Sequence, residues 1–242
     1  MIDSNDKDTH DAFVSFEQIE RENFVTNALV PGNGHYQAVK PDTFYRVTGN
    51  RYAGSKTPDA VRDLWATDRE VISWMESRYG KYDIDAAASA NNAVCEKFYS
   101  EQVNCLKIWW GSNKNIWLNP PYSHPDPFVK KAIEQMEHNN QIDMLLPGDN
   151  STAWFAEARR NAAEIIWIEA DITEIDRQEY CRTGRLAFIS GLTGKPVDGN
   201  NKGSVIFIMR KLKEGETQQT HYVSVSDICP GVSRKKPRKR SV

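Results

Sequence analysis

The sequence predicts an α/β domain with a mainly parallel, twisted sheet and helices on both of its faces. Short apolar runs typical of strands alternate along the chain with segments of helical period, which indicates parallel strands joined by helical crossovers. The run 165–168 is apolar almost without interruption, as expected for a strand that is buried on both faces. The length of 242 residues suffices for one such domain with appendages.

The first regular element is a helix with recognisable ends. Thr67 and Glu70 have the T-x-x-E spacing of a capping box, and Gly80 stands where a helix commonly ends. The apolar side chains between them fall on one helical face, namely Val71, Ile72, Met75 and Tyr79. The sequence therefore predicts an amphipathic helix from about residue 67 to residue 80.

Two further helices and seven strands follow. Asp126 as N-cap and Pro127 at the first helical position predict one helix, and Ser151 or Thr152 is expected to cap the next. The run of small residues at 86–90 is expected to turn or to begin a helix. The predicted strands are residues 82–85, 115–118, 142–146, 165–168, 186–189, 205–209 and 222–225, with a loop at 191–203.

Composition excludes several classes of protein. The mean hydropathy is -0.64, and no stretch is apolar enough to span a membrane. The first twenty residues contain six acidic side chains and no apolar core of a signal peptide, so we expect the protein to stay in the cytoplasm. The 4 cysteines show no C-x-x-C spacing and the 5 histidines do not pair with them at zinc-ligand intervals, so neither a disulfide scaffold nor a metal site is expected.

Charge is distributed unevenly along the chain. The formal net charge is -2, but the last nine residues contain six positive charges, and subtracting these leaves the rest near -8. A basic tail on an acidic body suits contact with a phosphate backbone, because neutralised phosphates release counterions. A solvated tail that only aids solubility is the alternative interpretation.

Two other clusters carry less weight in the sequence. Asp171, Glu174 and Asp176 form an acidic cluster that we expect on the solvated face of a helix or loop. Trp109 and Trp110 belong either to the core or to a surface that stacks on nucleic-acid bases. The core is the favoured interpretation.

Polar residues stand at two positions where a ligand would bind. In an open α/β sheet, ligands bind beyond the carboxyl ends of the strands. Asp85 closes the first predicted strand, and Asn119, Pro120, Pro121 and Tyr122 directly follow the second. These residues are the candidate site.

The tetrapeptide suits an amino group attached to an aromatic ring. Consecutive prolines make a rigid loop whose carbonyl oxygens are free to accept hydrogen bonds. The Asn119 side-chain oxygen and the Pro120 carbonyl could accept the hydrogens of such an amine and turn its lone pair toward an electrophile. The Tyr122 ring offers a flat face to a stacked base. The alternative is a strand-ending turn in which Tyr122 only packs.

The tetrapeptide, with Asp85 upstream, resembles the S-adenosylmethionine-dependent amino-methyltransferases. The chain is more closely similar to the phage-type DNA N6-adenine methyltransferases, the phage Dam family, over roughly residues 56–211. The matching segments are Trp65 and Thr67, 82–89, 92–95, 117–123, 145–147, 154–155, 184–188 and 203–205. The resemblance implies a Rossmann-like methyltransferase domain at 57–228, a polar N-terminal extension at 1–56 and a basic C-terminal tail at 229–242.

The resemblance also implies roles for individual residues. S-adenosylmethionine is the implied cofactor, and the tetrapeptide from Asn119 to Tyr122 would hold the target adenine. The implied cofactor site comprises Trp65, Thr67, Asp85, Ala86, Ala87, Ser89, Asn92 and Asn104. Within the matched region, Arg185 is the implied candidate for DNA contact. The further candidate DNA contacts do not rest on the resemblance: Ser123 and His124 follow the tetrapeptide directly, and the charge of the tail suggests Arg234, Lys235, Lys236, Arg238, Lys239 and Arg240. Methyltransferases in general carry glycines where alanines stand in the turn at 86–88, whereas the phage group resembles this chain there.

The implied reaction is direct transfer of the sulfonium methyl group to adenine N6 in double-stranded DNA, with GATC as the suggested site. The adenine must leave the base stack to reach the protein. The protein supplies positioning and acceptors, so neither a metal nor a cysteine nucleophile is expected. A monomer is the expected oligomeric state. Two alternatives stay open: a methyltransferase acting on RNA guanine or protein glutamine, and a catalytically silent DNA-binding protein that keeps the fold as a scaffold.

Overall fold

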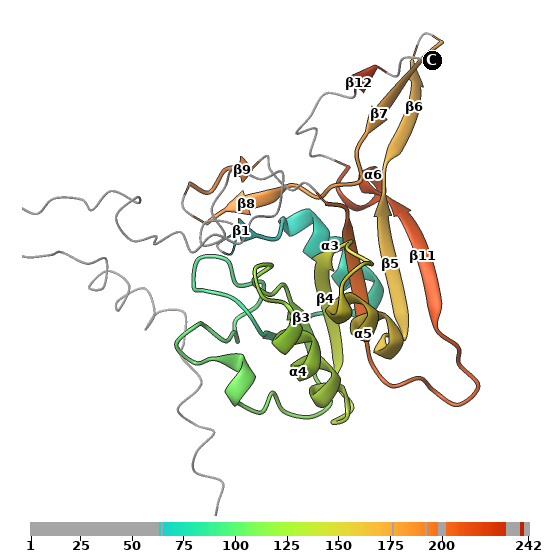
Figure 1. Cartoon of the computed structure of the whole chain (residues 1–242). Helices are drawn as coiled ribbons and strands as arrows, with labels where there is room; N and C mark the ends of the chain where they lie inside the picture. The colour runs from blue at the N-terminus through green and yellow to red at the C-terminus, as the bar shows by residue number, and fades with distance from the viewer. Residues whose placement is uncertain are drawn as a thin grey trace, which may run out of the picture.

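A six-stranded sheet forms the centre of the molecule. The computed structural model describes Asp63 and residues 65–175, 177–191, 193–197, 202–230 and 238–239. The order of the strands across the sheet is β11-β5-β10-β4-β3-β2 (Figure 1). The strands are β2 (Ile84–Asp85), β3 (Asn115–Leu118), β4 (Gln141–Pro147), β5 (Glu164–Glu169), β10 (Ser204–Met209) and β11 (Gln219–Ser224).

The central sheet is mixed. Strands β2, β3 and β4 are parallel to one another, and β11 is parallel to β5. Strand β10 lies between β4 and β5 and is antiparallel to both, so it alone of the six runs the opposite way. The prediction of a mainly parallel sheet missed this reversal, because an apolar run has the same pattern in either direction.

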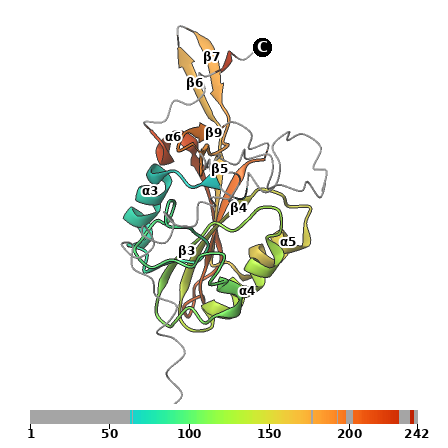
Figure 2. The ribbon, with the colours of Figure 1, turned by 90° about the vertical axis from the view of Figure 1, so that its left-hand side faces the viewer.

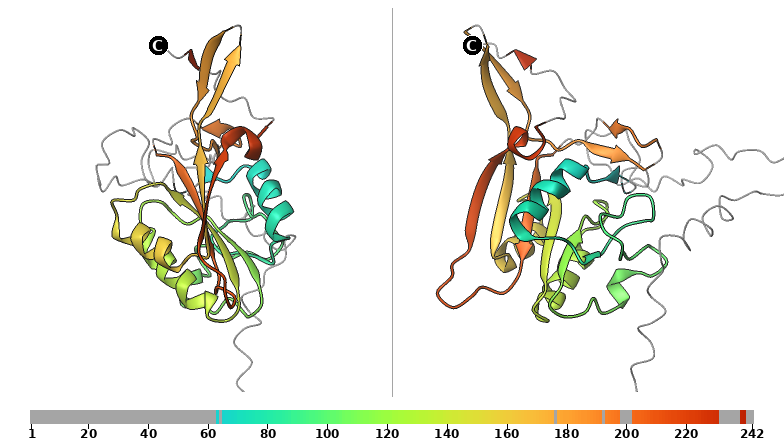
Figure 3. Two further views of the ribbon diagram at one scale, coloured as in Figure 1. Left: turned by 90° about the vertical axis from the view of Figure 1, so that its right-hand side faces the viewer. Right: turned by 180° about the vertical axis from the view of Figure 1, so that it is seen from behind.

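Helices cover both faces of the central sheet, as predicted. Helices α4 (Asp126–Met136) and α5 (Ala153–Asn161) pack on one face, and α3 (Arg69–Tyr79) and α6 (Val225–Ile228) pack on the other (Figures 2 and 3). Each face has its own cluster of buried apolar side chains. Full burial of one such side chain contributes roughly 1.5–3 kcal/mol, so the two clusters supply most of the stability.

The ends of α3 are set by residues close to those predicted. The N-cap is Asp68 rather than Thr67, because the Asp68 carboxylate accepts a hydrogen bond from the Glu70 amide at 2.9 Å. The predicted capping box is therefore wrong by one position. The helix ends at Gly80 as predicted: this residue has a φ of 91°, where glycine is favoured, and its amide donates to the Glu76 carbonyl at 3.0 Å.

The next two helices begin without a side-chain cap. Pro125 takes the N-cap position of α4 in place of Asp126, which forms an ion pair with Lys130 at 2.6 Å instead. Thr152 is the N-cap of α5, but its hydroxyl donates to the Asp149 carbonyl rather than accepting from the helix. None of the helices in the described part of the chain is long and apolar enough to cross a membrane.

Several strands differ from the prediction. Strand β2 is shorter than the predicted 82–85, and the predicted strand 222–225 ends early because Val225 begins α6. The run 86–90 turns without forming a helix. Trp110 is buried in the core as favoured, whereas Trp109 is 53% exposed.

Two small sheets and a short 3-10 helix were not predicted, although the predicted strand 186–189 overlaps β8 (Phe188–Ser190) in the first of these sheets. The first sheet joins strands from distant parts of the chain, and the second is a hairpin with a third strand. The first sheet consists of β1 (Trp65–Ala66), β8 and β9 (Pro196–Val197). The second consists of β6 (Asp171–Ile175), β7 (Gln178–Arg182) and β12 (Arg238–Lys239). The short 3-10 helix is η3 (Cys105–Lys107). Asp171 and Glu174 therefore lie on a strand rather than on a helix or loop, while Asp176 falls outside the described residues.

A buried carboxyl group on β4 makes the stability depend on pH. Asp143 is fully buried and accepts hydrogen bonds from the Tyr82 hydroxyl at 2.9 Å and the Gln141 amide at 3.0 Å. Burial raises the pKa of Asp143 to about 7. Since the folded state binds this proton more tightly than the unfolded chain does, its contribution to stability is present below about pH 4 and is lost as the pH rises toward 7.

The variant Asp143→Asn is expected to flatten this pH dependence. The asparagine oxygen can still accept from the Gln141 amide, and its NH2 group can donate to the Tyr82 hydroxyl oxygen in place of the bond that Asp143 accepts. The buried charge is removed, so the variant should be more stable than the parent protein by roughly 1–3 kcal/mol near pH 8. Urea unfolding at several pH values from 5 to 8 measures the effect. Parallel stability curves for the two proteins would show that Asp143 does not titrate in this range.

Candidate active site

The two predicted site segments lie side by side at the carboxyl edge of the sheet. Strands β2 and β3 are parallel, with Asp85 opposite Trp117. The Ala86 amide donates to the Trp117 carbonyl at 2.9 Å, so the turn after β2 continues along the end of β3. Asn119 follows β3 directly and therefore stands next to that turn.

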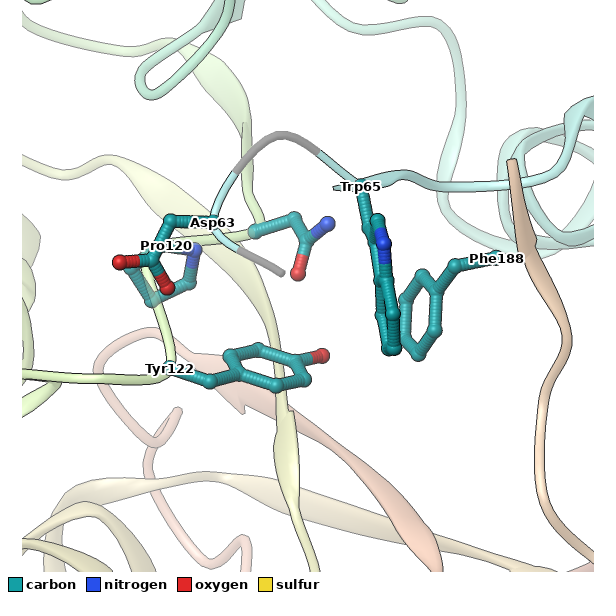
Figure 4. A pocket seen from close by; sticks show the side chains of 6 residues that line it. Asp63, Trp65, Pro120, Tyr122 and Phe188 are labelled. Atoms are coloured by element: carbon teal, nitrogen blue, oxygen red, sulfur yellow. The ribbon is translucent and has the colours of Figure 1, made fainter. Parts of the chain in front are cut away.

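A small pocket opens beside the tetrapeptide, and segments far apart in the sequence form its walls (Figure 4). Strand β1 pairs with β8 in the antiparallel direction, with Trp65 opposite Ser190. The Trp65 ring therefore lies next to side chains of β8. The pocket is partly open to solvent. The lining residues are Asp63, Trp65, Asn119, Pro120, Tyr122 and Phe188.

Aromatic rings form most of the wall opposite the proline loop. Tyr122 meets Phe188 edge to face, with ring centroids 5.8 Å apart and an interplanar angle of 84°. Trp65 stacks on the Phe188 ring, with centroids 6.1 Å apart and an interplanar angle of 22° (Figure 4). This arrangement provides flat apolar surfaces of the kind on which a base stacks.

Buried polar atoms without a partner in the described part of the chain occur in the pocket, at Asn119 and Tyr122, and at the start of α3. Among the described residues, none forms a hydrogen bond with Asn119 Oδ1, Tyr122 Oη, Thr67 Oγ1 or Glu70 Oε2, and all four atoms are buried. A buried polar group without a partner destabilises a protein by roughly 1–3 kcal/mol, and a bound ligand can remove that cost. Burial also raises the pKa of Tyr122, so its phenol stays neutral.

Asp85 organises the turn next to the pocket. Its carboxylate accepts hydrogen bonds from the backbone amides of Ala87 at 3.3 Å and Val94 at 3.0 Å. Arg69 on α3 holds the same loop by donating to the carbonyls of Ala93 at 2.7 Å and Val94 at 3.1 Å. Burial raises the pKa of Asp85 to about 7 despite these bonds.

The other predicted cofactor residues bond within their own loops. Asn92 Oδ1 accepts from the Ser89 amide at 2.6 Å and the Ser89 hydroxyl at 3.1 Å. Asn104 has a φ of 54°, and its side chain accepts from the Leu106 amide as the cap of η3. None of the predicted cofactor residues except Trp65 lines the pocket.

The predicted DNA contacts are exposed where the structure describes their side chains. Ser123, His124 and Arg185 all lie on the surface. Arg238 and Lys239 form β12, which pairs with β7. The remaining predicted DNA contacts lie outside the described residues: Arg234, Lys235, Lys236 and Arg240.

Sequence reasoning missed two residues of the pocket. The Asp63 carboxylate accepts a hydrogen bond from the Ser123 hydroxyl at 2.6 Å, which ties the segment before β1 to the proline loop. Phe188 belongs to a segment that matched the phage family, but no role was assigned to it. Only the tertiary structure brings Phe188 against the Tyr122 ring and Asp63 against Ser123, the residue after Tyr122.

Three of the four cysteines have environments that disfavour the thiolate. Burial raises the pKa values of Cys95, Cys105 and Cys229 to about 12 each, so these thiols stay protonated near neutral pH. In the described part of the chain, no group of three His, Cys, Asp or Glu side chains could hold a metal ion.

Comparison with known proteins identifies the family. The family model for DNA N-6-adenine-methyltransferase (Dam) matches residues 54–231. The chain belongs to the Dam family. A DNA N-6-adenine-methyltransferase of Escherichia phage T1 is 70% identical over 218 residues, which cover 90% of this chain and 92% of that protein. A protein of the same description from Haemophilus phage HP1 (strain HP1c1) is 34% identical over 176 residues, or 72% of this chain and 94% of that protein.

The predicted resemblance to phage-type DNA N6-adenine methyltransferases is confirmed. The family favours adenine in DNA over the alternatives of RNA guanine and protein glutamine. No solved structure matches the chain.

Proposed function

We propose that this Dam-family protein transfers the methyl group of S-adenosylmethionine to N6 of an adenine that is flipped out of double-stranded DNA. The observation that carries the proposal is the buried Asn119 Oδ1, which has no partner among the described residues and lies in an aromatic-walled pocket. The exocyclic amine of adenine offers the hydrogen that this oxygen lacks. Family membership supports adenine as the substrate base.

In this proposal, the protein acts by orienting the amine. Asn119 Oδ1 and the Pro120 carbonyl each accept one N–H of the amine, which turns the nitrogen lone pair away from the ring and toward the methyl donor. The Tyr122 ring stacks on the base and fixes its plane. No ionised side chain is required, which agrees with the neutral Tyr122 phenol.

The cofactor fits the residues at the carboxyl edge. When bound, S-adenosylmethionine supplies an electrophilic methyl group. We place it between the turn that Asp85 organises and the start of α3, where Thr67 Oγ1 and Glu70 Oε2 are buried without a partner in the described part of the chain. A Rossmann-like methyltransferase fold is supported by the five strands that run in one direction and by the helices on both faces.

The pocket is partly open to solvent, and we propose that the base enters from that open side with Trp65 and Phe188 as its aromatic walls. Unstacking the base from DNA costs a few kcal/mol, and stacking and hydrogen bonds in the pocket offset this cost. We assign the supporting DNA contacts to Ser123, His124, Arg185 and the basic tail, and GATC is the proposed site.

The relatives come from phages, so we place the activity in the cytoplasm of a bacterial host, with the protein acting as a monomer. Mass spectrometry of nucleosides tests the reaction. Unmethylated DNA is incubated with purified protein and S-adenosylmethionine, and N6-methyladenine is the expected product. A sample without S-adenosylmethionine is the control.

Two negative results would contradict the proposal in different ways. Cofactor binding without any methylated nucleoside would redirect the search to RNA or protein substrates. DNA binding without cofactor binding would favour a catalytically silent DNA-binding protein.

A further inference from the structure

The β6–β7 hairpin stands apart from the core of the molecule. None of its described residues belongs to either apolar cluster, and Ile172 on β6 is 59% exposed. The hairpin projects beyond the body of the molecule, and β12 pairs with β7 along its side (Figures 1 and 3). Because such a ribbon adds little apolar burial to the domain, its surface is available to a partner.

Hydrogen bonds at the base of the hairpin fix its orientation relative to the start of α6. Asp171 and Arg182 stand opposite each other where the two strands begin and end. Asp171 accepts hydrogen bonds from the hydroxyls of Ser224 and Ser226, and Arg182 donates to the Ser226 hydroxyl at 3.0 Å. Just after β7, a Cβ atom on Gly184 would come within 2.5 Å of the β5 backbone, so the chain there is closely packed.

The hairpin rises at the same end of the central sheet as the pocket. Strands β3 and β5 run in the same direction, and β6 follows β5 after one residue. Three interstrand steps separate β5 from β3, or about 14 Å, and the hairpin strands of five residues reach roughly 17 Å further. A duplex whose adenine enters the pocket therefore lies within reach of the hairpin.

The two faces of the hairpin differ in chemistry. Opposite residues of an antiparallel pair share a face, so Glu174 lies with Glu179 on one face and Thr173 with Tyr180 on the other. The Thr173 face also carries Asp171, whose hydrogen bonds connect it to the start of α6. The aromatic side chains of the pocket pack in the cluster that includes α3 and α6, so the Thr173 face and the pocket are on the same side of the sheet.

We propose that the Thr173 face of the hairpin, with Arg177 at the tip, enters the major groove and reads base pairs next to the target adenine. A two-stranded ribbon fits the major groove, where arginine recognises guanine and threonine contacts the thymine methyl group. Arg177 is exposed and holds the turn with a φ of 60°. The proposal rests on the proposed methylation of adenine in DNA.

The charge of the ribbon is close to balanced. The hairpin has Asp171, Glu174 and Glu179 against Arg177 and Arg182 among its described residues, and β12 places Arg238 and Lys239 next to β7. Net charge therefore does not distinguish the hairpin from the rest of the surface, and discrimination between base pairs depends on side chains that contact base edges.

A methylation profile over a pool of duplexes tests the proposal. The pool presents adenine in every flanking context, and sequencing of the modified sites gives relative rates. The variants Arg177→Ala and Thr173→Ala are each expected to relax the preference at one flanking position by about tenfold. Two control variants should keep the parent profile: Glu174→Ala on the opposite face, and Arg160→Ala, which is exposed near the end of α5.

Three outcomes separate the possibilities. A relaxed preference in the two test variants, with the salt slope of duplex binding unchanged, supports base reading. An unchanged profile in both test variants, or a uniform loss of binding with a smaller salt slope, overturns it. Failure of the parent protein to methylate any duplex contradicts the proposed function itself rather than the role of the hairpin.

Discussion

Replacing Asn119 by alanine is expected to reduce methyl transfer by on the order of 10²–10³-fold while the fold stays intact. The substitution removes a buried oxygen that has no partner among the described residues and that we aim at the adenine amine. Loss of one oriented hydrogen-bonding group at a reacting centre has an effect of this size. Single-turnover kinetics with a duplex substrate measures the rate, and thermal unfolding verifies the fold.

Comparison of the Asn119→Ala and Asn119→Asp variants distinguishes the role of the side-chain oxygen in methyl transfer from that of the whole amide group. Aspartate retains an acceptor oxygen at the same place, so its rate should fall less than that of the alanine variant. The melting temperature of Asn119→Ala should equal or exceed that of the parent, because the substitution removes an unsatisfied buried atom. Undiminished turnover by the alanine variant would falsify the role of Asn119.

Replacing Tyr122 by alanine should reduce methyl transfer by roughly 10- to 100-fold, whereas phenylalanine should be tolerated. Alanine loses the ring on which the base stacks and the edge-to-face contact with Phe188 at 5.8 Å. Phenylalanine keeps both and removes only a buried hydroxyl that has no partner among the described residues. Steady-state kinetics of the two variants, at saturating and limiting DNA, measures the difference.

A tyrosine far from the pocket serves as the matched control for Tyr122. Tyr222 on β11 is 66% exposed, so Tyr222→Ala removes the same ring without touching the proposed site. Its kinetics should match those of the parent protein. Equal losses in Tyr122→Ala and Tyr122→Phe would assign the effect to the hydroxyl and not to stacking.

Local sequence signals predicted the elements next to the site well. The apolar run 115–118 is β3, and its end places Asn119 at the carboxyl edge as expected. Gly80 ends α3, because a φ of 91° is favourable for glycine. The errors at Thr67 and Asp126 are shifts of one residue. At α3 the Asp68 carboxylate, one residue after Thr67, accepts the Glu70 amide, whereas Asp126 lies in the first turn of α4 and pairs with Lys130.

Long-range pairing could not be predicted in the same way. The sequence predicts β10 as a buried strand. Its antiparallel direction depends on the edge of the sheet from which the chain enters β10 after the hairpin and residues 191–203. Strand β1 has only two residues, and its pairing with β8 bridges more than a hundred positions. Such pairings leave no periodic pattern because they depend on the packing of the whole sheet.

The sequence by itself determined the α/β class, the apolar faces of the helices and the tetrapeptide at the end of β3, because each follows from the order of neighbouring residues. Only the tertiary structure decided which side chains surround Tyr122. The pairing of β1 with β8 brings Trp65 and Phe188 to the pocket, and the Asp63–Ser123 hydrogen bond joins the segment before β1 to the proline loop. Contacts between residues distant in the chain form only once the sheet is assembled, so the walls of the pocket are a property of the fold.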